Sequence, residues 1–181
     1  MNYAEIKYVN TANGPGSRTV LFVSGCTHHC KGCFNEVAWD FAYGHPFTAE
    51  VEQQILDSLA PVFIRGLTLL GGEPMEPVNQ RALLPFVRKV RRLYPRKTIW
   101  CFSGYLYEEL LPGGRAHCDA TDELLSLMDV LVDGEFVQEL ADIMLRFRGS
   151  SNQRILDLPA SRAAGQPVLW TGDPFFADHK M

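Results

Sequence analysis

The sequence predicts an α/β fold in which parallel strands alternate with crossover helices, as a layer or a partial barrel. Three short apolar runs begin at positions 67, 98 and 130, a nearly regular step of about 30 residues. Helical patterns fill the intervals between these runs. Strands joined by such long connections pair in parallel, and their crossovers are right-handed.

The elements follow from apolar runs and from helical periodicity. The expected strands are Thr19–Ser24, Leu67–Leu70, Thr98–Phe102, Val130–Asp133 and a further one at Ile155–Leu158, and the expected helices are Glu50–Leu59, Arg81–Tyr94 and Asp122–Met128. In the first helix, Val51, Ile55 and Leu59 fall on one face. Each of the first four strands is followed by glycine or a polar residue, and ligands of such folds bind at the carboxyl ends of strands. Cys26, Gly71, Ser103 and Asp133 should therefore converge.

Length and composition limit the class of protein. The 181 residues suit one domain, and 46% of them are hydrophobic, which is enough for a core. A net charge of -4 argues against a broad nucleic-acid-binding surface. Neither a signal peptide nor an apolar run of membrane-spanning length is visible. Five cysteines without an export signal indicate the cytoplasm, where cysteines act as ligands more often than as disulfides.

Three cysteines within eight residues form the most informative motif. Cys26, Cys30 and Cys33 have the spacing C-x3-C-x2-C. Three thiolates can hold three irons of a [4Fe–4S] cube and leave the fourth iron open to a small molecule. The spacing alone leaves two alternatives, a zinc site completed by His28 or His29 and a thiol redox site.

A second motif, Gly71-Gly72-Glu73-Pro74, follows the strand Leu67–Leu70. Glycine allows a close backbone approach to a ligand, and Glu73 is able to accept a hydrogen bond from an ammonium group. On its own this is also the pattern of an ordinary turn. Its predicted position beside the cysteine motif favours a shared site.

Together, the cysteine motif and the Gly71–Pro74 turn resemble the radical S-adenosylmethionine (SAM) superfamily. The segments Asn13–Arg18 and Ile99–Leu110 are similar to those of activases of glycyl radical enzymes. The segment Asp129–Leu158 looks very like the activating proteins of anaerobic ribonucleoside-triphosphate reductase. The resemblance runs in order from Tyr3 to Leu158.

This resemblance implies an incomplete TIM-type barrel of the radical SAM type, with one [4Fe–4S] cluster and SAM as cofactors. In that superfamily the reduced cluster cleaves SAM, and a 5′-deoxyadenosyl radical results. The implied activity is an oxidoreductase that generates a glycyl radical on the large subunit of anaerobic ribonucleoside-triphosphate reductase. Residues 1–158 are then the activase domain, and residues 159–181 are a tail that either is partly disordered or packs back through its aromatic residues.

Site residues carry over by their positions in the motifs. Cys26, Cys30 and Cys33 match the cluster ligands. The residues that match SAM-binding positions are Gly32, Cys33 and Phe34 along the adenosine, Gly71, Gly72 and Glu73 at the methionine ammonium, and Ser103 and Asp133 at strand ends. Larger activases have a basic residue where this chain has Glu135, so the methionine carboxylate needs another partner, such as Arg146, Arg148 or Arg154.

The sequence leaves the reductant and the class of function open. The basic residues Arg88, Lys89, Arg91, Arg92, Arg96 and Lys97 form either a solvated helix face or a docking site for an acidic, flavodoxin-like reductant. The rival functions are a different small radical SAM enzyme and a non-catalytic zinc or redox-sensing module. Neither a nucleic acid nor a membrane is expected as a partner.

Overall fold

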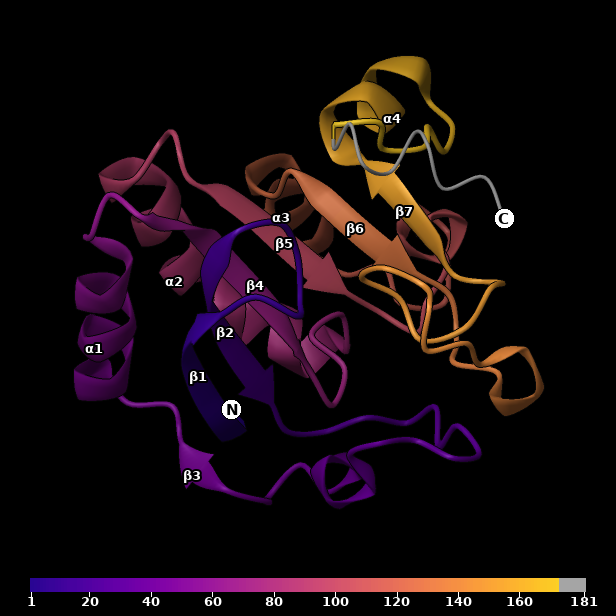
Figure 1. The fold of residues 1–181 in the computed structure, drawn as a ribbon, viewed down its shortest axis with the longest axis horizontal. Coiled ribbons are helices and arrows are strands. Elements are labelled where there is room, and N and C mark those ends of the chain that lie inside the picture. The colour runs from indigo at the N-terminus through magenta and orange to yellow at the C-terminus, as the bar shows by residue number, and fades with distance from the viewer. Residues whose placement is uncertain (173–181) are drawn as a thin grey trace.

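A computed structural model describes residues 1–172, whose strands form one open sheet in the order β3-β1-β2-β4-β5-β6-β7 (Figure 1). The strands are β1 (Asn2–Asn10), β2 (Ser17–Val23), β3 (His45–Pro46), β4 (Ile64–Gly71), β5 (Thr98–Phe102), β6 (Val130–Asp133) and β7 (Arg154–Asp157). The α-helices are α1 (Ala49–Leu59), α2 (Pro77–Leu93), α3 (Thr121–Leu127) and α4 (Leu158–Ala164). Short 3-10 helices are η1 (Glu36–Trp39), η2 (Tyr107–Leu110) and η3 (Gln138–Leu140).

The central strands confirm the α/β prediction. β2, β4, β5 and β6 pair in parallel, with α1, α2 and α3 in the connections between them. β1, β3 and β7 pair antiparallel at the two sides, and the sheet does not close into a barrel. β1 was not predicted, because its exposed, polar sequence has no buried run.

The two faces of the sheet have different cores. The helices cover one face, where Leu69, Ile99 and Leu131 pack with helix residues such as Phe86. On the other face, smaller clusters of strand residues form around Trp100 and around Phe22. Both faces of the parallel strands are therefore largely buried, which explains their continuous apolar runs.

Capping residues explain where the helices begin. Thr48 accepts a hydrogen bond from the Val51 amide at the start of α1. Pro77 occupies the first turn of α2, where its missing N–H costs nothing, so this helix begins four residues before the predicted start. Within residues 1–172, no helix is long and apolar enough to cross a membrane.

The chain after β7 is ordered as far as the structure describes it. Asp157 caps α4, and residues after the helix return to pair with β7 through a bridge between Leu156 and Leu169. The Trp170 ring packs edge-on against Trp100. Two other aromatic residues of the expected tail, Phe175 and Phe176, lie outside the described residues. The division of the chain at residue 158 stays a prediction.

Candidate functional site

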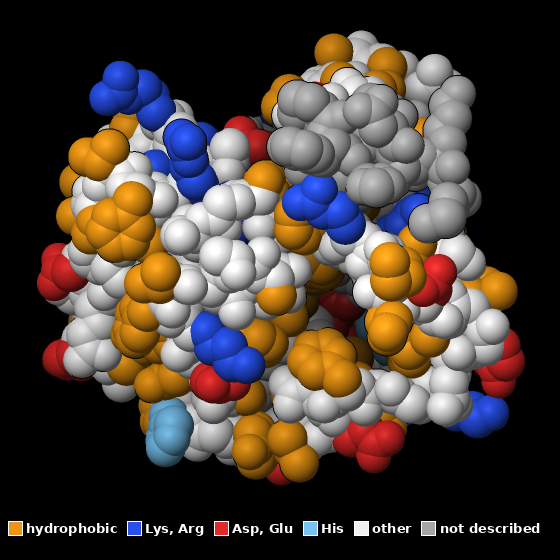
Figure 2. All heavy atoms as spheres, viewed as in Figure 1, with side chains coloured by type: hydrophobic (Ala, Val, Ile, Leu, Met, Phe, Trp, Pro, Cys, Tyr) orange, Lys and Arg blue, Asp and Glu red, His pale blue; other side chains and the backbone are white. Residues whose placement is uncertain are grey.

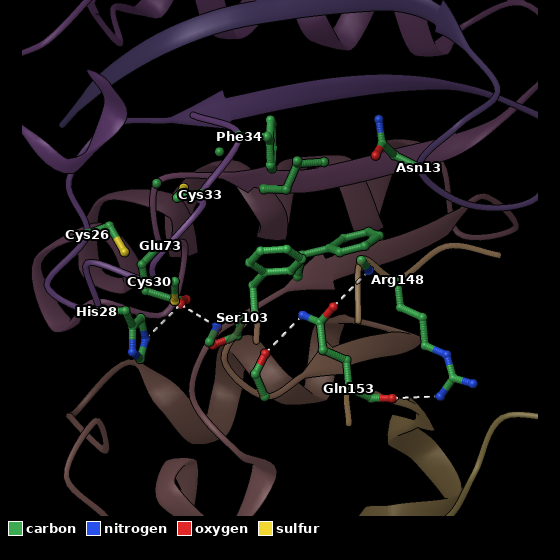
Figure 3. Close-up of a pocket in the computed structure, with 18 of the residues that line it drawn as sticks. Asn13, Cys26, His28, Cys30, Cys33, Phe34, Glu73, Ser103, Arg148 and Gln153 are labelled. Atoms are coloured by element: carbon green, nitrogen blue, oxygen red, sulfur yellow. Dashed lines mark hydrogen bonds and ion pairs between the residues drawn. The ribbon is translucent and has the colours of Figure 1, made fainter. Parts of the chain in front are cut away.

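A cavity of about 360 Å³, within the usual range for small-molecule sites, lies at the carboxyl ends of the parallel strands. The residues of its wall that the sequence predicted are Cys26, Cys30, Gly32, Cys33, Phe34, Gly71, Gly72, Glu73 and Ser103. Figure 3 shows the labelled cysteines, His28, Glu73 and Ser103 toward one end and Asn13, Arg148 and Gln153 toward the other. The structure thus brings two distant motifs together.

Asp133 is the one predicted site residue that the structure does not bring into this cavity. Its fully buried carboxylate accepts hydrogen bonds from the Arg154 guanidinium, at 2.9 and 2.5 Å, and from the Tyr107 amide at 2.7 Å. Its neighbour Gly134 lines the cavity instead. The carboxylate at the end of β6 therefore has a visible role in joining β6 to β7 and η2.

The cysteine loop is fastened at several points. The Gly25 and Cys26 amides donate to carbonyl groups of η1. The Glu76 carboxylate accepts from both the amide and the hydroxyl of Thr27, at 2.9 and 2.5 Å. His29 has a left-handed backbone with φ 53°, which is uncommon outside glycine and bends the loop between the cysteines. These contacts hold the loop across the end of β2.

The three thiols lie around one space, because Cys26, Cys30 and Cys33 all line the cavity. Within the described part of the chain, no group of three His, Cys, Asp or Glu side chains is gathered closely enough to hold one metal ion. A cube places each thiolate on a separate iron, so three thiols around a common space fit its ligand set.

Burial, with a smaller contribution from the Glu73 carboxylate, raises the pKa of Cys26 to about 12, although two backbone hydrogen bonds lower it. Burial also raises the pKa of Cys30. Metals bind the thiolate form. The positive charge of bound iron must therefore offset the cost of placing thiolates in this poorly hydrated end of the cavity.

The glycines of the turn are required by the neighbouring protein backbone. Gly71 has φ 118°, a conformation that other residues rarely adopt. A Cβ atom on Gly72 would lie 2.6 Å from the Gly25 carbonyl oxygen and 2.8 Å from that of Ala38. Glycine at both positions lets the end of β4 lie directly against the cysteine loop.

Glu73 is 1% exposed, and its carboxylate is already held by the protein. Oε1 accepts from the Met75 amide at 2.7 Å, and Oε2 accepts from the Gly104 amide at 2.6 Å. The expected ligand ammonium would thus be an additional partner. The carboxylate fixes the turn and supplies a negative charge beside the cysteine loop.

His28 links the cysteine loop to both carboxylates at this end of the cavity. Its Nδ1 is 2.9 Å from Glu135, and its Nε2 is 3.2 Å from Glu73, an ion-pair distance without hydrogen-bond geometry. Burial by itself lowers the pKa of His28, but the two carboxylates outweigh this effect and raise it. His28 thus positions the loop, and no sequence pattern distinguished it from His29.

Two buried polar residues that the sequence analysis missed also support the site. The Asn79 amide, at the start of α2, donates to the carbonyls of Ser24 and Glu73 at 3.0 and 2.9 Å. The Arg18 guanidinium donates to the hydroxyls of Thr68 and Thr98 and to two backbone carbonyls. For Arg18, the sequence pattern that could have identified it was a charged side chain within a buried strand. No such pattern marked Asn79.

The structure distinguishes the three candidate arginines. Arg148 lines the cavity and donates to the Gln153 carbonyl at 2.7 Å, whereas its buried Nε has no hydrogen-bond partner. Arg154 is bound by Asp133 and Glu108. Arg146 lies over the ring of Phe147. Of the three, Arg148 is therefore the guanidinium in the cavity wall, at the end away from the cysteines in Figure 3.

Exposed apolar side chains occur at the cavity and close to it in the sequence. The lining residue Phe34 is 78% exposed, and Met144 and Ile143, one and two residues before the lining residue Leu145, are 70% and 100% exposed. Figure 2 shows a hollow on this face with hydrophobic side chains along its edge. A hollow of this kind is accessible to a large molecule.

Most residues of the predicted basic cluster form ion pairs or hydrogen bonds within the protein. Arg88 pairs with Glu123, and Arg91 pairs with Asp129. Lys97 donates to two backbone carbonyls. These residues lie in the C-terminal half of α2 and just after it. The helix begins near the cavity, and its 17 residues span about 25 Å. The cluster therefore lies away from the cysteines.

Comparison with known proteins agrees with this site. Residues 12–156 match the family model of a 4Fe-4S single cluster domain. The chain is 47% identical over 157 residues to a protein of Haemophilus influenzae, covering 86% of this chain and 97% of the relative. That relative is named anaerobic ribonucleoside-triphosphate reductase-activating protein. This chain belongs to the family of anaerobic ribonucleoside-triphosphate reductase-activating proteins.

Two further members of this family have the same name. The protein of Vibrio cholerae is 46% identical over 157 residues, covering 86% of this chain and 97% of the relative. That of Escherichia coli K12 is 43% identical over 155 residues, covering 84% and 96%. The predicted family membership is thus confirmed, and the 4Fe-4S domain includes the cysteine loop, Glu73 and Arg148.

Proposed function

We propose that this chain is a radical SAM activase that cleaves SAM reductively at one [4Fe–4S] cluster and generates a glycyl radical on anaerobic ribonucleoside-triphosphate reductase. The observation that carries the proposal is that Cys26, Cys30 and Cys33 line the same cavity as the Gly71–Glu73 turn. The proposal includes an incomplete barrel of the radical SAM type for the open sheet. It also includes a cytoplasmic location and a flavodoxin-like reductant.

The residues have separate roles in this proposal. The three cysteines hold the cluster, and the backbone of Gly32–Phe34 lies along the adenosine. Glu73 keeps the turn rigid and adds negative charge for the methionine ammonium, while Ser103 supplies a hydroxyl in the cavity wall. Asp133 acts by positioning Arg154 and the end of β6, since its carboxylate is occupied.

The reaction needs little acid–base chemistry from the protein. A reduced cluster held by Cys26, Cys30 and Cys33 would supply the single electron for reductive cleavage of SAM, and the products would be methionine, 5′-deoxyadenosine and, after loss of a hydrogen atom from a glycine Cα, a glycyl radical on the reductase. The chain binds SAM, orients it and excludes water. The exposed apolar side chains of Phe34, in the cavity wall, and of Ile143 and Met144, just before the lining residue Leu145, would contact the protein substrate.

Product analysis tests this function. The protein is reconstituted with iron and sulfide under anaerobic conditions, reduced with dithionite and given SAM, with and without the reductase. We expect 5′-deoxyadenosine and methionine in equal amounts, with more of both and a glycyl radical signal when the reductase is present. A full cluster that binds SAM but gives no cleavage with the reductase would overturn the proposal. A colourless protein with stoichiometric zinc would support the non-catalytic alternative.

A further inference from the structure

The loop that carries Arg148 is held in an unfavourable backbone conformation. Phe147 lines the cavity and has φ 57°, in the left-handed region. A bulky side chain rarely adopts this region, and such strain persists only where the surrounding structure holds it. Something must therefore fix Phe147 against the sheet.

Trp100 supplies the surface on which Phe147 rests. The fully buried Trp100 ring is 5.6 Å from the Phe147 ring, centroid to centroid, in an edge-on arrangement. The Arg18 guanidinium lies 5.7 Å from the same indole. A Cβ atom on Gly14 would come within 3.3 Å of that indole, next to the lining residue Asn13. Trp100 thus supports two parts of the cavity wall.

Trp170 completes the packing around Trp100 from the far end of the chain. Its ring centroid is 4.9 Å from that of Trp100, with an interplanar angle of 82°. Its amide donates to the Ile155 carbonyl at 2.9 Å, and the Asp157 amide donates to the Val168 carbonyl at 2.9 Å. Two backbone hydrogen bonds and the bridge between Leu156 and Leu169 therefore fix the backbone of Trp170 alongside β7.

This support comes from outside the region that defines the family. The family model ends at residue 156, whereas α4 and Trp170 follow it. The match to the Haemophilus influenzae relative covers 97% of that protein but 86% of this chain. The C-terminal segment 158–172 thus follows the residues that the family model matches.

We propose that Trp170 is a positioning residue for the cavity: through Trp100 it holds Phe147 and the adjoining Arg148 in the cavity wall. The C-terminal segment 158–172 is then part of the ligand-binding structure. The identity of the ligand, SAM, rests on the proposed function, but the positioning of the loop does not.

Hydrogen exchange of the metal-free full-length protein tests the positioning directly. In Trp170→Ala, amides in residues 141–149 should exchange at least about threefold faster, because an aromatic contact that restrains the loop is lost. Leu169→Ala is the matched control, since Leu169 has the same backbone pairing and a side chain that is 63% exposed. Unchanged exchange in Trp170→Ala would overturn the proposal.

Binding of SAM to the reconstituted protein tests the consequence. Equilibrium dialysis should give a Kd about fivefold higher for Trp170→Ala, and Trp170→Phe should recover most of the loss. Each variant is measured well below its melting temperature, and Trp170→Leu replaces Trp170→Ala if the latter does not fold. Faster loop exchange with an unchanged Kd would reduce Trp170 to a structural role and overturn the proposal.

The two assays separate this proposal from the proposed function. If the wild-type protein takes up a full cluster but does not bind SAM, the proposed function fails. The exchange rates of residues 141–149 then decide the positioning role by themselves, with faster exchange supporting it and unchanged exchange refuting it.

Discussion

The Glu73 carboxylate accepts a hydrogen bond from the Gly104 amide at 2.6 Å, which ties the end of β4 to the end of β5. The same carboxylate accepts from the Met75 amide and faces His28 of the cysteine loop. One buried side chain thus connects three segments that line the cavity. Its substitution should affect the geometry of the site as well as its charge.

Glu73→Gln should keep the cluster and weaken SAM binding. The amide retains one acceptor oxygen, but its NH2 group must face a backbone N–H, and the negative charge is lost. We expect about a tenfold higher Kd for SAM, with normal iron content. Equilibrium dialysis and an iron assay measure the two quantities, and Glu50→Gln, on the exposed start of α1, is the control. A Kd equal to that of the wild type would rule out a role for this charge.

Cys30→Ala should abolish the intact cluster. A cube with two protein thiolates and two open irons is poorly held, so we expect most of the iron and the brown absorbance to be lost after reconstitution. Cys118→Ala is the matched control, because Cys118 is half-buried and outside the cavity wall. Iron and sulfide analysis checks the result, and a full cluster in Cys30→Ala would refute the ligand assignment.

Arg18→Met should destabilise the fold strongly. Its guanidinium satisfies two hydroxyls and two carbonyls in a fully buried place, and burial lowers its pKa only to about 9, so it remains charged at neutral pH. Removing it leaves buried acceptors without donors, at a cost of roughly 3 kcal/mol or more in the free energy of unfolding. Urea unfolding measures this loss, and the exposed Arg92→Met should change little.

The Arg154–Glu108 pair should make stability depend on pH. The hydrogen bond from Arg154 lowers the pKa of Glu108 below its usual 4.5. A carboxyl with a depressed pKa stabilises the folded state above its unfolded pKa, and this contribution is lost as the pH falls through the folded pKa. The difference in melting temperature between wild type and Glu108→Gln should therefore be present at neutral pH and vanish in acid. A difference that persists at a pH at which Glu108 is protonated in both the folded and the unfolded state would contradict this origin.

The sequence predicted the parallel centre of the fold and most of the site because both depend on local patterns. Buried strands such as Thr98–Phe102 and Val130–Asp133 were predicted with their observed bounds. The cysteine motif and the glycine turn line one cavity, because parallel strands bring their carboxyl ends to the same edge of the sheet.

What the sequence left out depends on contacts between distant segments. β1 lacks a buried run, and one of the carbonyls that Asn79 binds, that of Ser24, is 55 residues away. Asp133 stands at a strand end like Ser103, yet Arg154 occupies its carboxylate. Spacing alone does not tell a strand-end residue that faces a ligand from one that binds a neighbouring strand.

Ile143→Glu should weaken binding of the reductase without affecting cleavage of SAM. The side chain of Ile143 is wholly exposed and lies two residues from Leu145, which lines the cavity that a protein substrate has to reach. A charge there must be desolvated when an apolar surface docks, which should raise the Kd about tenfold or more. Val62→Glu is the control, because Val62 is 94% exposed and precedes β4, at the opposite end of the parallel strands.

Two measurements separate docking from chemistry for Ile143→Glu. Dithionite-driven formation of 5′-deoxyadenosine in the absence of the reductase should equal that of the wild type, since the substitution leaves the cysteine loop and the turn untouched. Surface-immobilised reductase should bind Ile143→Glu more weakly than Val62→Glu. Equal binding of the two variants would place the docking surface away from residues 140–145, and a loss of cleavage without the reductase would mean that this loop also shapes the cavity.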